Sequence, residues 1–274
     1  MARTGLNLDD GQYGFREGRS TINAISHLRT LSEAVVKEGR VAVAVSIDIA
    51  NAFNTLPWGS VVKEMKDYFK LGLTVAERKT EAIFFHQKGR KPPQAHLRIG
   101  RVRIPVEAQM RYLGLILDGT WCFKEHFRCL VPRLKVISNN LGKLMPNVGG
   151  PDMKARRLHA GIINSVALYG APIWAETLAA SHPLQALLRT AHRTVAVRVI
   201  RAYRTVSHVA ATALAGMPPL ELLALMYKNV YRKKGELRRN LRAGKSLPGA
   251  LRHLKHQGRQ LFLQRWQRRL CNAK

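Results

Sequence analysis

The sequence predicts an α+β protein in which a strand-containing part precedes a long helical part. Short apolar runs of strand composition occur up to about residue 118, whereas apolar residues recur at helical spacing from residue 123 onward. With 274 residues, 46% of them hydrophobic, the chain can bury at least one core, and two subdomains would fit. We therefore expect a strand-containing region over 1–118, a helical region over 119–180 and a basic helical region over 181–274.

The first elements are predicted from periodicity and turn residues. Apolar positions recur every three or four residues after Ser20, which can cap a helix that ends at Gly39. The β-branched run 41–47 is typical of a strand buried on both faces, and it places Asp48 at the strand's carboxyl end. Pro57 suits the first turn of a further helix that extends to about residue 69.

The middle of the chain predicts further strands. Residues 81–85 have strand composition, and 96–104 alternate apolar and basic residues around Gly100, as a half-buried hairpin does. The polar face of that hairpin would consist of arginine, and residues 112–118 form another predicted strand. The predicted helices lie near 123–144, 152–170, 182–201, 207–215, 219–242 and 248–271.

The charge of the chain points to a polyanionic partner. Its 46 Lys and Arg residues exceed its 17 Asp and Glu residues, which gives a formal net charge of +29. Binding to phosphates releases counterions and favours such a basic chain irrespective of nucleic-acid sequence. The alternative is a basic fragment of a larger protein whose other regions balanced the charge.

The number of cysteines and the hydropathy of the chain indicate its cellular compartment. Cys122, Cys129 and Cys271 are an odd number without Cys-x-x-Cys spacing, so neither a disulfide framework nor a zinc knuckle is indicated. The chain has neither an apolar leader at its start nor a run of about 18 apolar residues. We expect an intracellular protein, in the nucleus, the cytoplasm or both, that does not bind a membrane.

Asp48 is the candidate catalytic residue, because nucleotidyl transfer uses two divalent metal ions held by carboxylates. Asp48 follows a buried strand, and Phe53, five residues on, could lie under an incoming sugar. Taken alone, an Asp between an apolar strand and Pro57 is more often a turn or cap residue.

Four stretches in a fixed order resemble motifs of reverse transcriptases from non-LTR retrotransposons. Residues 12–21, Gln-Tyr-Gly-Phe-Arg-Glu-Gly-Arg-Ser-Thr, resemble the fingers motif, and 48–53, Asp-Ile-Ala-Asn-Ala-Phe, resemble the first palm motif. Residues 71–73 with Lys79 resemble the later palm motif that carries a lysine, and 112–118 resemble the primer grip.

The second half of the chain extends this resemblance. Its stretches are similar to the thumb and post-thumb region of arthropod elements that insert into ribosomal RNA genes: 141–145, 149–151, 157–158 and 168–174. The chain is identified as a member of this family, which implies a truncated right-hand polymerase. Partial fingers and palm would be followed by a mostly α-helical thumb and C-terminal region.

The resemblance also implies roles for single residues. Asp48 and the Ile49 carbonyl would bind Mg²⁺, and Phe53 would exclude a ribose 2′-hydroxyl. Arg16 and Arg19 would approach the template or the triphosphate, since a planar guanidinium grips phosphate in two places.

The later motifs imply roles for further residues, and the resemblance as a whole implies the family's partners. Lys79 would lie near the nucleotide's phosphates, although by itself it reads as an ordinary solvated lysine. Tyr112, Leu113 and Gly114 would form the primer grip. The family's partners are an RNA template, a DNA primer or target DNA, and deoxynucleoside triphosphates.

The sequence departs from the family between residues 70 and 71. The Pro-Gln-Gly motif and the aromatic-Ala-Asp-Asp turn, which carries the second acidic motif, are missing there. Asp67, Glu77, Glu81 and Asp118 remain, but none forms a tight pair on a predicted strand turn. We therefore expect an internally deleted fragment, also shortened at both ends, without polymerase activity, and with the apolar edge of the 41–47 strand exposed.

A second hypothesis is a noncatalytic protein, derived from the element, that binds RNA or DNA. Residues 228–274 carry 15 Lys or Arg residues and one acid, Glu236. Phe262 and Trp266 are either available for stacking on bases or part of the core. An unrelated basic structural protein would have to match four ordered motifs by chance. The candidate nucleic-acid contacts are Arg98, Arg101, Arg103, Lys233, Lys234, Arg238 and Arg239.

Overall fold

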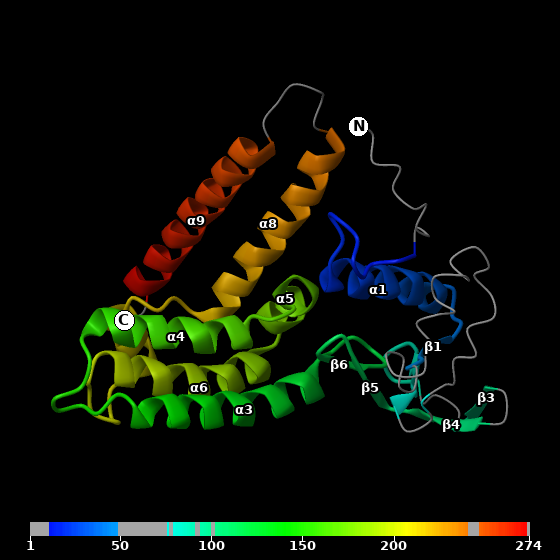
Figure 1. Ribbon diagram of the computed structural model, residues 1–274, viewed down its shortest axis with the longest axis horizontal. Helices are drawn as coiled ribbons and strands as arrows, with labels where there is room; N and C mark the ends of the chain where they lie inside the picture. Colours follow the sequence, from blue (N-terminus) through cyan, green and yellow to red (C-terminus); the bar gives the residue numbers. More distant parts are fainter. Residues whose placement is uncertain are drawn as a thin grey trace, which may run out of the picture. The chain divides into compact units, whose positions relative to one another are not determined.

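The computed structural model describes residues 11–48, 76, 79–90, 94–99, 102–240 and 247–272. The chain divides into two compact units, Met1–Cys122 and Phe123–Lys274. Figure 1 shows the described strands in the first unit, here called the sheet unit, and a set of helices in the second, here called the helical unit. The predicted α+β class is confirmed, while the division of the helical part at residue 180 stays a prediction.

The first helix forms where the sequence predicts it. α1 spans Thr21–Lys37, and the Ser20 hydroxyl caps it by accepting a hydrogen bond from the Asn23 amide. Gly39 follows the helix with a φ of 76°, a backbone conformation that glycine adopts without strain.

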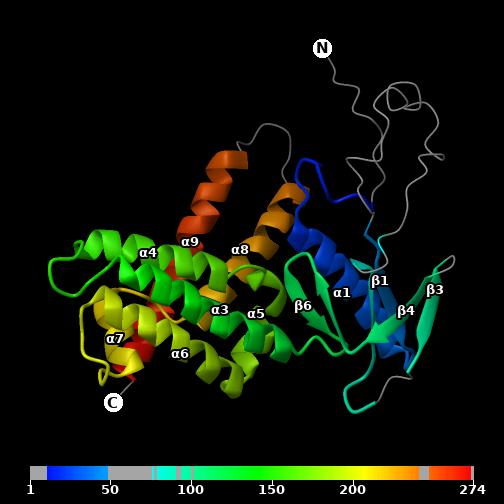
Figure 2. The same ribbon diagram turned by 60° about the horizontal axis from the view of Figure 1, so that its bottom comes forward.

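Four strands form a sheet in the order β1-β2-β4-β3. β1 and β2 are antiparallel, β2 and β4 are parallel, and β3 and β4 form the predicted antiparallel hairpin. α1 packs against β1 and β2, as Figure 2 shows. The strand bounds are β1 (Ala42–Ser46), β2 (Glu81–Phe85), β3 (His96–Ile99) and β4 (Val102–Glu107).

The prediction that the 41–47 strand is buried on both faces is wrong. β1 is an edge strand of this sheet, and Val43 and Val45 are 45% and 37% exposed. Ile47, the next residue on the same face, is 54% exposed. Alternate residues of β1 therefore form an apolar face that the other described residues leave uncovered.

The predicted strand over 112–118 is in fact a tight hairpin. β5 (Gln109–Tyr112) pairs antiparallel with β6 (Leu115–Asp118), and Leu113 and Gly114 connect them with φ values of 46° and 85°. Two consecutive residues with positive φ are typical of a type I′ turn, whose twist matches that of a hairpin. β5 was not predicted, because Leu113 and Gly114 look like part of one continuous apolar run in the sequence rather than like a turn.

The core of the sheet unit lies between these strands and α1. Phe85 stacks on Trp121 with ring centroids 4.9 Å apart, and Ile83, Leu115 and Leu117 are fully buried. The Trp121 indole N–H donates to the hydroxyl of Ser32 on α1 over 3.1 Å. This bond ties the helix to the core.

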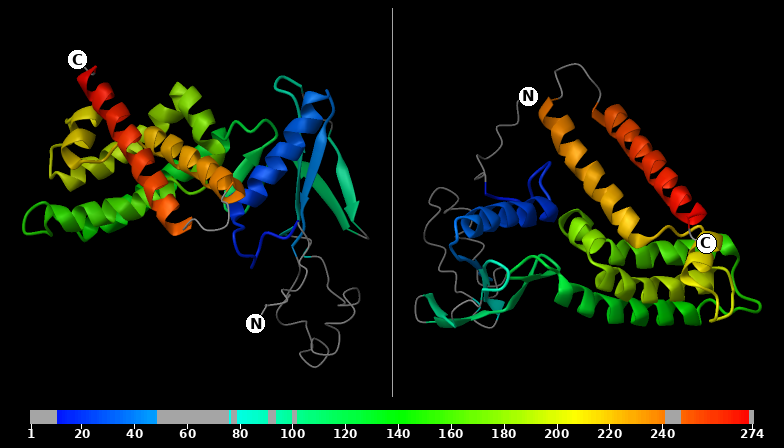
Figure 3. Two further views of the ribbon diagram at one scale, coloured as in Figure 1. Left: turned by 90° about the horizontal axis from the view of Figure 1, so that it is seen from above. Right: turned by 180° about the vertical axis from the view of Figure 1, so that it is seen from behind.

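The helical unit contains the predicted helices and one that was not predicted. The expected helix over 152–170 ends at Ala167, and a separate helix follows Gly170, whose φ is 70°. Figure 1 shows α3, α4 and α6 side by side, and Figure 3 shows α8 and α9 as an antiparallel pair. The helices are α3 (Lys124–Lys143), α4 (Met153–Ala167), α5 (Ala171–Ala180), α6 (His182–Val199), α7 (His208–Ala215), α8 (Leu220–Asn240) and α9 (Leu247–Cys271).

Trp174 is the centre of the helical core. Its side chain is 0% exposed, and its ring meets Phe127 of α3 edge to face at 5.1 Å. Its indole N–H donates to the Tyr169 carbonyl over 3.0 Å, so its one polar atom is satisfied.

Among the described residues, no single helix is long and apolar enough to cross a membrane. The pair His208–Ala215 and Leu220–Arg238, bent by 55°, reaches that length and composition only when the two helices are taken together. The predicted helix over 57–69 and the junction between residues 70 and 71 lie outside the described residues.

Candidate functional site

The β1–β2 pairing brings Asp48 and Lys79 together. Ser46 pairs with Glu81, so continuing the antiparallel register two residues beyond the strands sets Asp48 opposite Lys79. The Lys79 ammonium lies 3.6 Å from Asp48 Oδ2, and the Asp48 carbonyl accepts a hydrogen bond from the Ala76 amide over 2.8 Å. Both side chains are largely exposed, at 50% for Asp48 and 74% for Lys79. A pair this exposed contributes little to stability.

Two other acids considered in the sequence analysis are bound to main-chain amides. A Glu81 carboxylate oxygen accepts from the Arg111 amide over 2.6 Å. Asp118 Oδ1 accepts from the amides of Thr120 and Cys122 and from the Thr120 hydroxyl. These carboxylates hold the hairpin and the turn after β6, and Asp67 and Glu77 lie outside the described residues.

The described residues contain no group of three or more His, Cys, Asp or Glu side chains arranged to hold a metal ion. Ile49 and Phe53 lie outside the described residues. Within the described part of the chain, Asp48 therefore lies beside the Lys79 ammonium and belongs to no cluster of carboxylates. A two-metal site of the kind that nucleotidyl transfer uses requires carboxylates close together.

The fingers-like residues pack near the hairpin predicted as the primer grip. The Arg19 guanidinium lies 5.2 Å from the centre of the Tyr13 ring, a cation–π distance, and the Tyr13 hydroxyl is 2.6 Å from His27 Nδ1. Burial, and then the nearby Tyr13, raise the pKa of Tyr112. Arg16 is half-buried, and its carbonyl accepts from the Arg19 amide.

The three residues predicted as the primer grip form the end of the β5–β6 hairpin. Tyr112 is the last residue of β5, and Leu113 and Gly114 make the turn, with Leu113 40% exposed. Whether this turn contacts a primer stays a prediction.

The arginines of the β3–β4 hairpin lie at the opposite sheet edge from Asp48. Arg98 and Arg103 are a directly facing cross-strand pair, both exposed, and His96 Nδ1 is 3.3 Å from Arg103 Nη2. Like charges directly opposite each other destabilise a sheet, and an anion bound between them would offset the repulsion. Arg101 lies outside the described residues.

The C-terminal basic residues cover the exposed sides of α8 and α9. Lys233 and Arg238 are exposed and Lys234 is half-buried, whereas the Arg239 side chain lies outside the described residues. α9 adds exposed basic residues along its length: Arg252, Lys255, Arg259, Arg265 and Arg268.

The aromatic residues of α9 do not present the exposed rings that base stacking, one of the two hypotheses for them, would require. Phe262 is only 6% exposed and is part of the core. Trp266 is half-buried, and its Nε1 is buried. Of the two hypotheses for these rings, the core position is correct for Phe262.

A buried polar cluster joins α6, α7, α8 and α9. Arg189 and Arg269 hold the buried Glu221 carboxylate at 2.7 and 3.0 Å. Burial alone would raise the pKa of Glu221, but the hydrogen bond from Arg189 and the two positive charges bring the pKa below its usual value. The rings of His192 and His208 lie 5.6 Å apart in the same region.

These two histidines are neutral at neutral pH. Burial, with His208 adding to it, lowers the pKa of His192 to about 3. Burial also lowers the pKa of His208, and the positive charge of Arg189 contributes. Nothing in the spacing of residues 192 and 208 in the sequence indicates that the two rings meet.

Several arginines of the helical unit bind main-chain carbonyls, which the sequence analysis did not foresee. Arg156, fully buried, donates to the carbonyls of Pro146, Pro151 and Arg198. Burial first, and then the charges of Arg201 and Arg198, lower its pKa. The one sequence signal was the nearby Gly-Gly-Pro stretch: a Cβ on Gly150 would meet the Pro146 carbonyl oxygen at 2.1 Å and the Arg156 guanidinium at 2.9 Å.

Comparisons with known proteins find retrotransposon relatives. The chain is 28% identical over 166 residues to the 115 kDa protein in type-1 retrotransposable element R1DM of Drosophila melanogaster, a match that covers 60% of this chain and 16% of that protein. It is 27% identical over 142 residues to the retrovirus-related Pol polyprotein from type-1 retrotransposable element R1 4 of Nasonia vitripennis, covering 51% of this chain and 36% of that protein.

The other comparisons give no match. No known protein-family profile matches the chain, and no solved structure matches it. The matched part of the chain spans well under half the length of either relative. The chain is thus similar to parts of proteins from R1-type non-LTR retrotransposons.

Proposed function

We propose that this chain is a remnant of an R1-type RNA-directed DNA polymerase, with a truncated right-hand fold, that does not catalyse template-primed DNA synthesis. The observation that carries the proposal is the environment of Asp48. Its carboxylate lies beside the Lys79 ammonium, and the described residues hold no cluster able to bind a metal ion.

The described residues do not fit the Mg²⁺ that the family uses. Mg²⁺ requires several oxygen ligands in near-octahedral geometry, whereas Asp48 supplies one half-exposed carboxylate that already faces a cation. Glu81 accepts a hydrogen bond from the Arg111 amide of β5, and Asp118 accepts one from the Thr120 amide in the turn after β6. No catalytic step through a metal ion is therefore derived for this chain.

Metal binding tests this part of the proposal directly. Mn²⁺ titrated into the full chain, followed by the paramagnetic signal of free Mn²⁺, is expected to give the same curve for wild type and for Asp48→Asn. The matched control is Lys79→Asn, which replaces the other member of the Asp48–Lys79 ion pair. A stoichiometric Mn²⁺ site that disappears in Asp48→Asn would contradict the proposal.

We also propose that the chain binds RNA or DNA through the exposed basic residues of α8 and α9, inside the cell and without a membrane. The specific observation is that exposed lysines and arginines recur along both helices of this pair. Phe262 is buried, while Lys233, Arg238 and Arg259 are exposed. Such a surface favours contacts with phosphates, which do not depend on the nucleotide sequence.

Salt dependence tests the binding proposal. The affinity for single-stranded RNA should fall steeply with salt, with a log–log slope of about −0.7 per neutralised phosphate. Replacing Lys233 and Arg238 by Gln should reduce the slope by about 1.4, for two lost contacts. The matched control is Arg133→Gln with Lys135→Gln, which removes the same charge from exposed positions of α3. Equal slopes for the two double variants would refute the role of the α8–α9 surface.

A further inference from the structure

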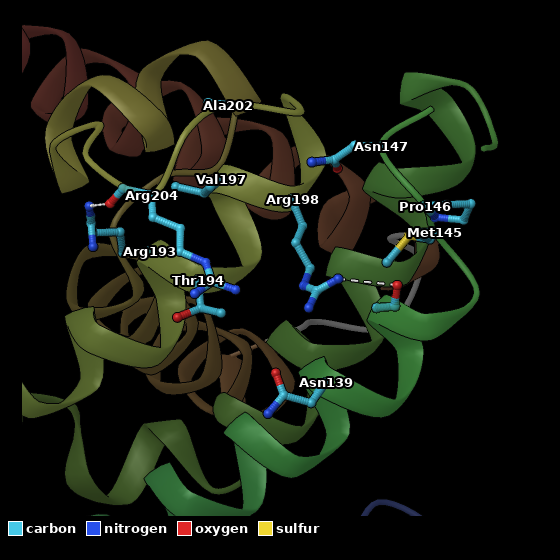
Figure 4. Close-up of a pocket in the computed structure, with 11 residues that line it drawn as sticks. Asn139, Met145, Pro146, Asn147, Arg193, Thr194, Val197, Arg198, Ala202 and Arg204 are labelled. Carbon is cyan, nitrogen blue, oxygen red and sulfur yellow. Dashed lines mark hydrogen bonds between the residues drawn. The ribbon is translucent and has the colours of Figure 1, made fainter. Parts of the chain in front are cut away.

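We infer that a hollow in the helical unit, lined by α3, α6 and the two loops that follow them, binds a single-stranded nucleic acid. The hollow has a volume of about 520 Å³, and its polar lining comprises three arginines, two asparagines and a threonine, with no acidic residue. This inference rests on the proposed nucleic-acid binding and adds a second site, distinct from the α8–α9 surface. The hollow is shown in Figure 4, and its polar residues are Asn139, Asn147, Arg193, Thr194, Arg198 and Arg204.

Main-chain carbonyls hold the guanidinium groups of Arg193 and Arg198, two of the three arginines that line the hollow. Arg198 donates to the Gly142 carbonyl over 3.1 Å, as the dashed line in Figure 4 shows. Arg193 donates to the carbonyl of Val206 over 2.7 Å and to that of Arg204. A carbonyl orients a guanidinium without neutralising its charge, and each guanidinium keeps further N–H groups for a phosphate.

The neighbouring arginines strengthen the positive field around the hollow. Arg201 donates to the carbonyls of Gly150 and Pro151, and the buried Arg156 binds the Arg198 carbonyl. Both are therefore also oriented by main-chain oxygens. Five guanidinium groups gather around two loops, an arrangement that attracts a polyanion.

Close packing fixes the shape of the hollow. A Cβ on Gly142 would lie 2.3 Å from the Arg198 guanidinium, so the arginine uses space that only glycine leaves. Arg193 and Arg198 lie on one helix, and Arg193 binds the loop after α6 while Arg198 binds the last turn of α3, so their positions are set by the fold. A fixed set of donors suits the phosphates of a bent strand.

An exposed tyrosine in the loop that contributes to the hollow favours a single strand over a duplex. Tyr203 is 86% exposed and stands between Ala202 and Arg204, which both line the hollow. An aromatic ring beside a basic groove can stack on an unpaired base, which a duplex does not present. The chemistry therefore selects an unpaired strand, of RNA or DNA, with little dependence on sequence.

Binding of labelled oligonucleotides to the full chain tests the inference. Strands of U and of dT, about 12 nucleotides long and within the usual site size, are titrated at several salt concentrations. Tyr203→Ala should weaken binding about tenfold, within the range for loss of one stacked base, whereas Tyr203→Phe should retain it. Arg204→Gln keeps the carbonyl that Arg193 binds and should reduce the salt slope by about 0.7.

The controls separate this site from the α8–α9 surface. Tyr227→Ala removes a tyrosine that is 44% exposed on α8, and Arg133→Gln removes a charge from α3; both should bind as wild type does. Tighter binding of U identifies RNA as the strand, tighter binding of dT identifies DNA, and each supports the site.

Other outcomes overturn the inference. If Tyr203→Ala and Arg204→Gln bind as tightly as wild type while the Lys233 and Arg238 double variant binds more weakly, the hollow is not a site and the proposed function stands. If the wild-type chain binds neither strand, both fail. A duplex that competes as well as the single strands would also overturn the inference.

Discussion

Strand β1 of the sheet unit and the core around Trp174 of the helical unit differ in how fully their apolar residues are covered. In the sheet unit, Val43, Val45 and Ile47 line one face of β1 and are 37–54% exposed. In the helical unit, Trp174 and Phe127 are fully buried. A helix satisfies its backbone within itself, whereas a strand depends on neighbours that often come from distant parts of the chain. Loss of a segment therefore damages a sheet more than a helical bundle built from consecutive helices.

The largest expected effect is on the helical core. Trp174→Ala removes a fully buried ring and should lower the free energy of unfolding of the helical unit by about 3–5 kcal/mol. Urea unfolding followed by circular dichroism measures the change. Val43→Ala in the sheet unit is the control and should change stability by under about 0.5 kcal/mol. Similar losses for both variants would show that β1 is covered after all.

Acid should destabilise the helical unit through its buried histidines. The folded-state pKa of His192 is about 3, below its usual 6.5, so the unfolded chain takes up the proton first as the pH falls. Stability is complete above about pH 7 and is lost on acidification toward pH 3, on the order of 2 kcal/mol or more by about pH 4.

Three other groups also destabilise the folded state in acid, and one of them is His208, whose pKa is lowered first by burial. The folded-state pKa of His126 is lowered to about 4 by burial, and the lowered pKa of Glu221 also means loss of stability in acid. His192→Gln should reduce the pH dependence measured by urea unfolding between about pH 7 and pH 4. An unchanged dependence in this variant would show that His192 is not the principal group.

Charges on the uncovered face of β1 should improve solubility. Val43→Lys with Val45→Lys places charge on an edge strand, the usual means by which natural sheets avoid edge-to-edge association. Light scattering of concentrated protein should fall relative to wild type, with little change in unfolding. The matched control is Leu158→Lys with Leu214→Lys, which alters two exposed leucines of the helical unit. Equal improvement in both variants would argue against a special role of the β1 face.

The smallest effect is expected at Asp48. Asp48→Ala and Lys79→Ala each break an exposed pair with an N–O distance of 3.6 Å, which should cost under about 1 kcal/mol. Thermal unfolding of both variants checks this. A loss of several kcal/mol in either would mean that the pair is buried by parts of the chain outside the described residues.

The sequence predicted elements whose cause is local. α1 and the long helices followed from apolar spacing and from caps such as Ser20, and the β3–β4 hairpin followed from alternation around Gly100. The wrong predictions concern contacts between elements. The exposure of β1, for example, depends on which strands pair with it. The β5–β6 turn needs two residues with positive φ, and Leu113 is rarely chosen for such a position.

The candidate site shows the same limit. Motif order predicted Asp48 and Lys79 separately, and the antiparallel register explains why they meet. The contacts of Arg156, Arg193 and Arg198 with main-chain carbonyls leave no pattern in the sequence, because any residue supplies a carbonyl.

Template-primed incorporation of labelled deoxynucleotides, with Mg²⁺ and a chain first shown to bind the template, is the most direct measurement. We expect no incorporation above background by the wild-type chain and no difference between it and Asp48→Ala, although both bind the template. Incorporation by wild type that is abolished in Asp48→Ala would contradict the account, because it would require a complete metal site around that carboxylate.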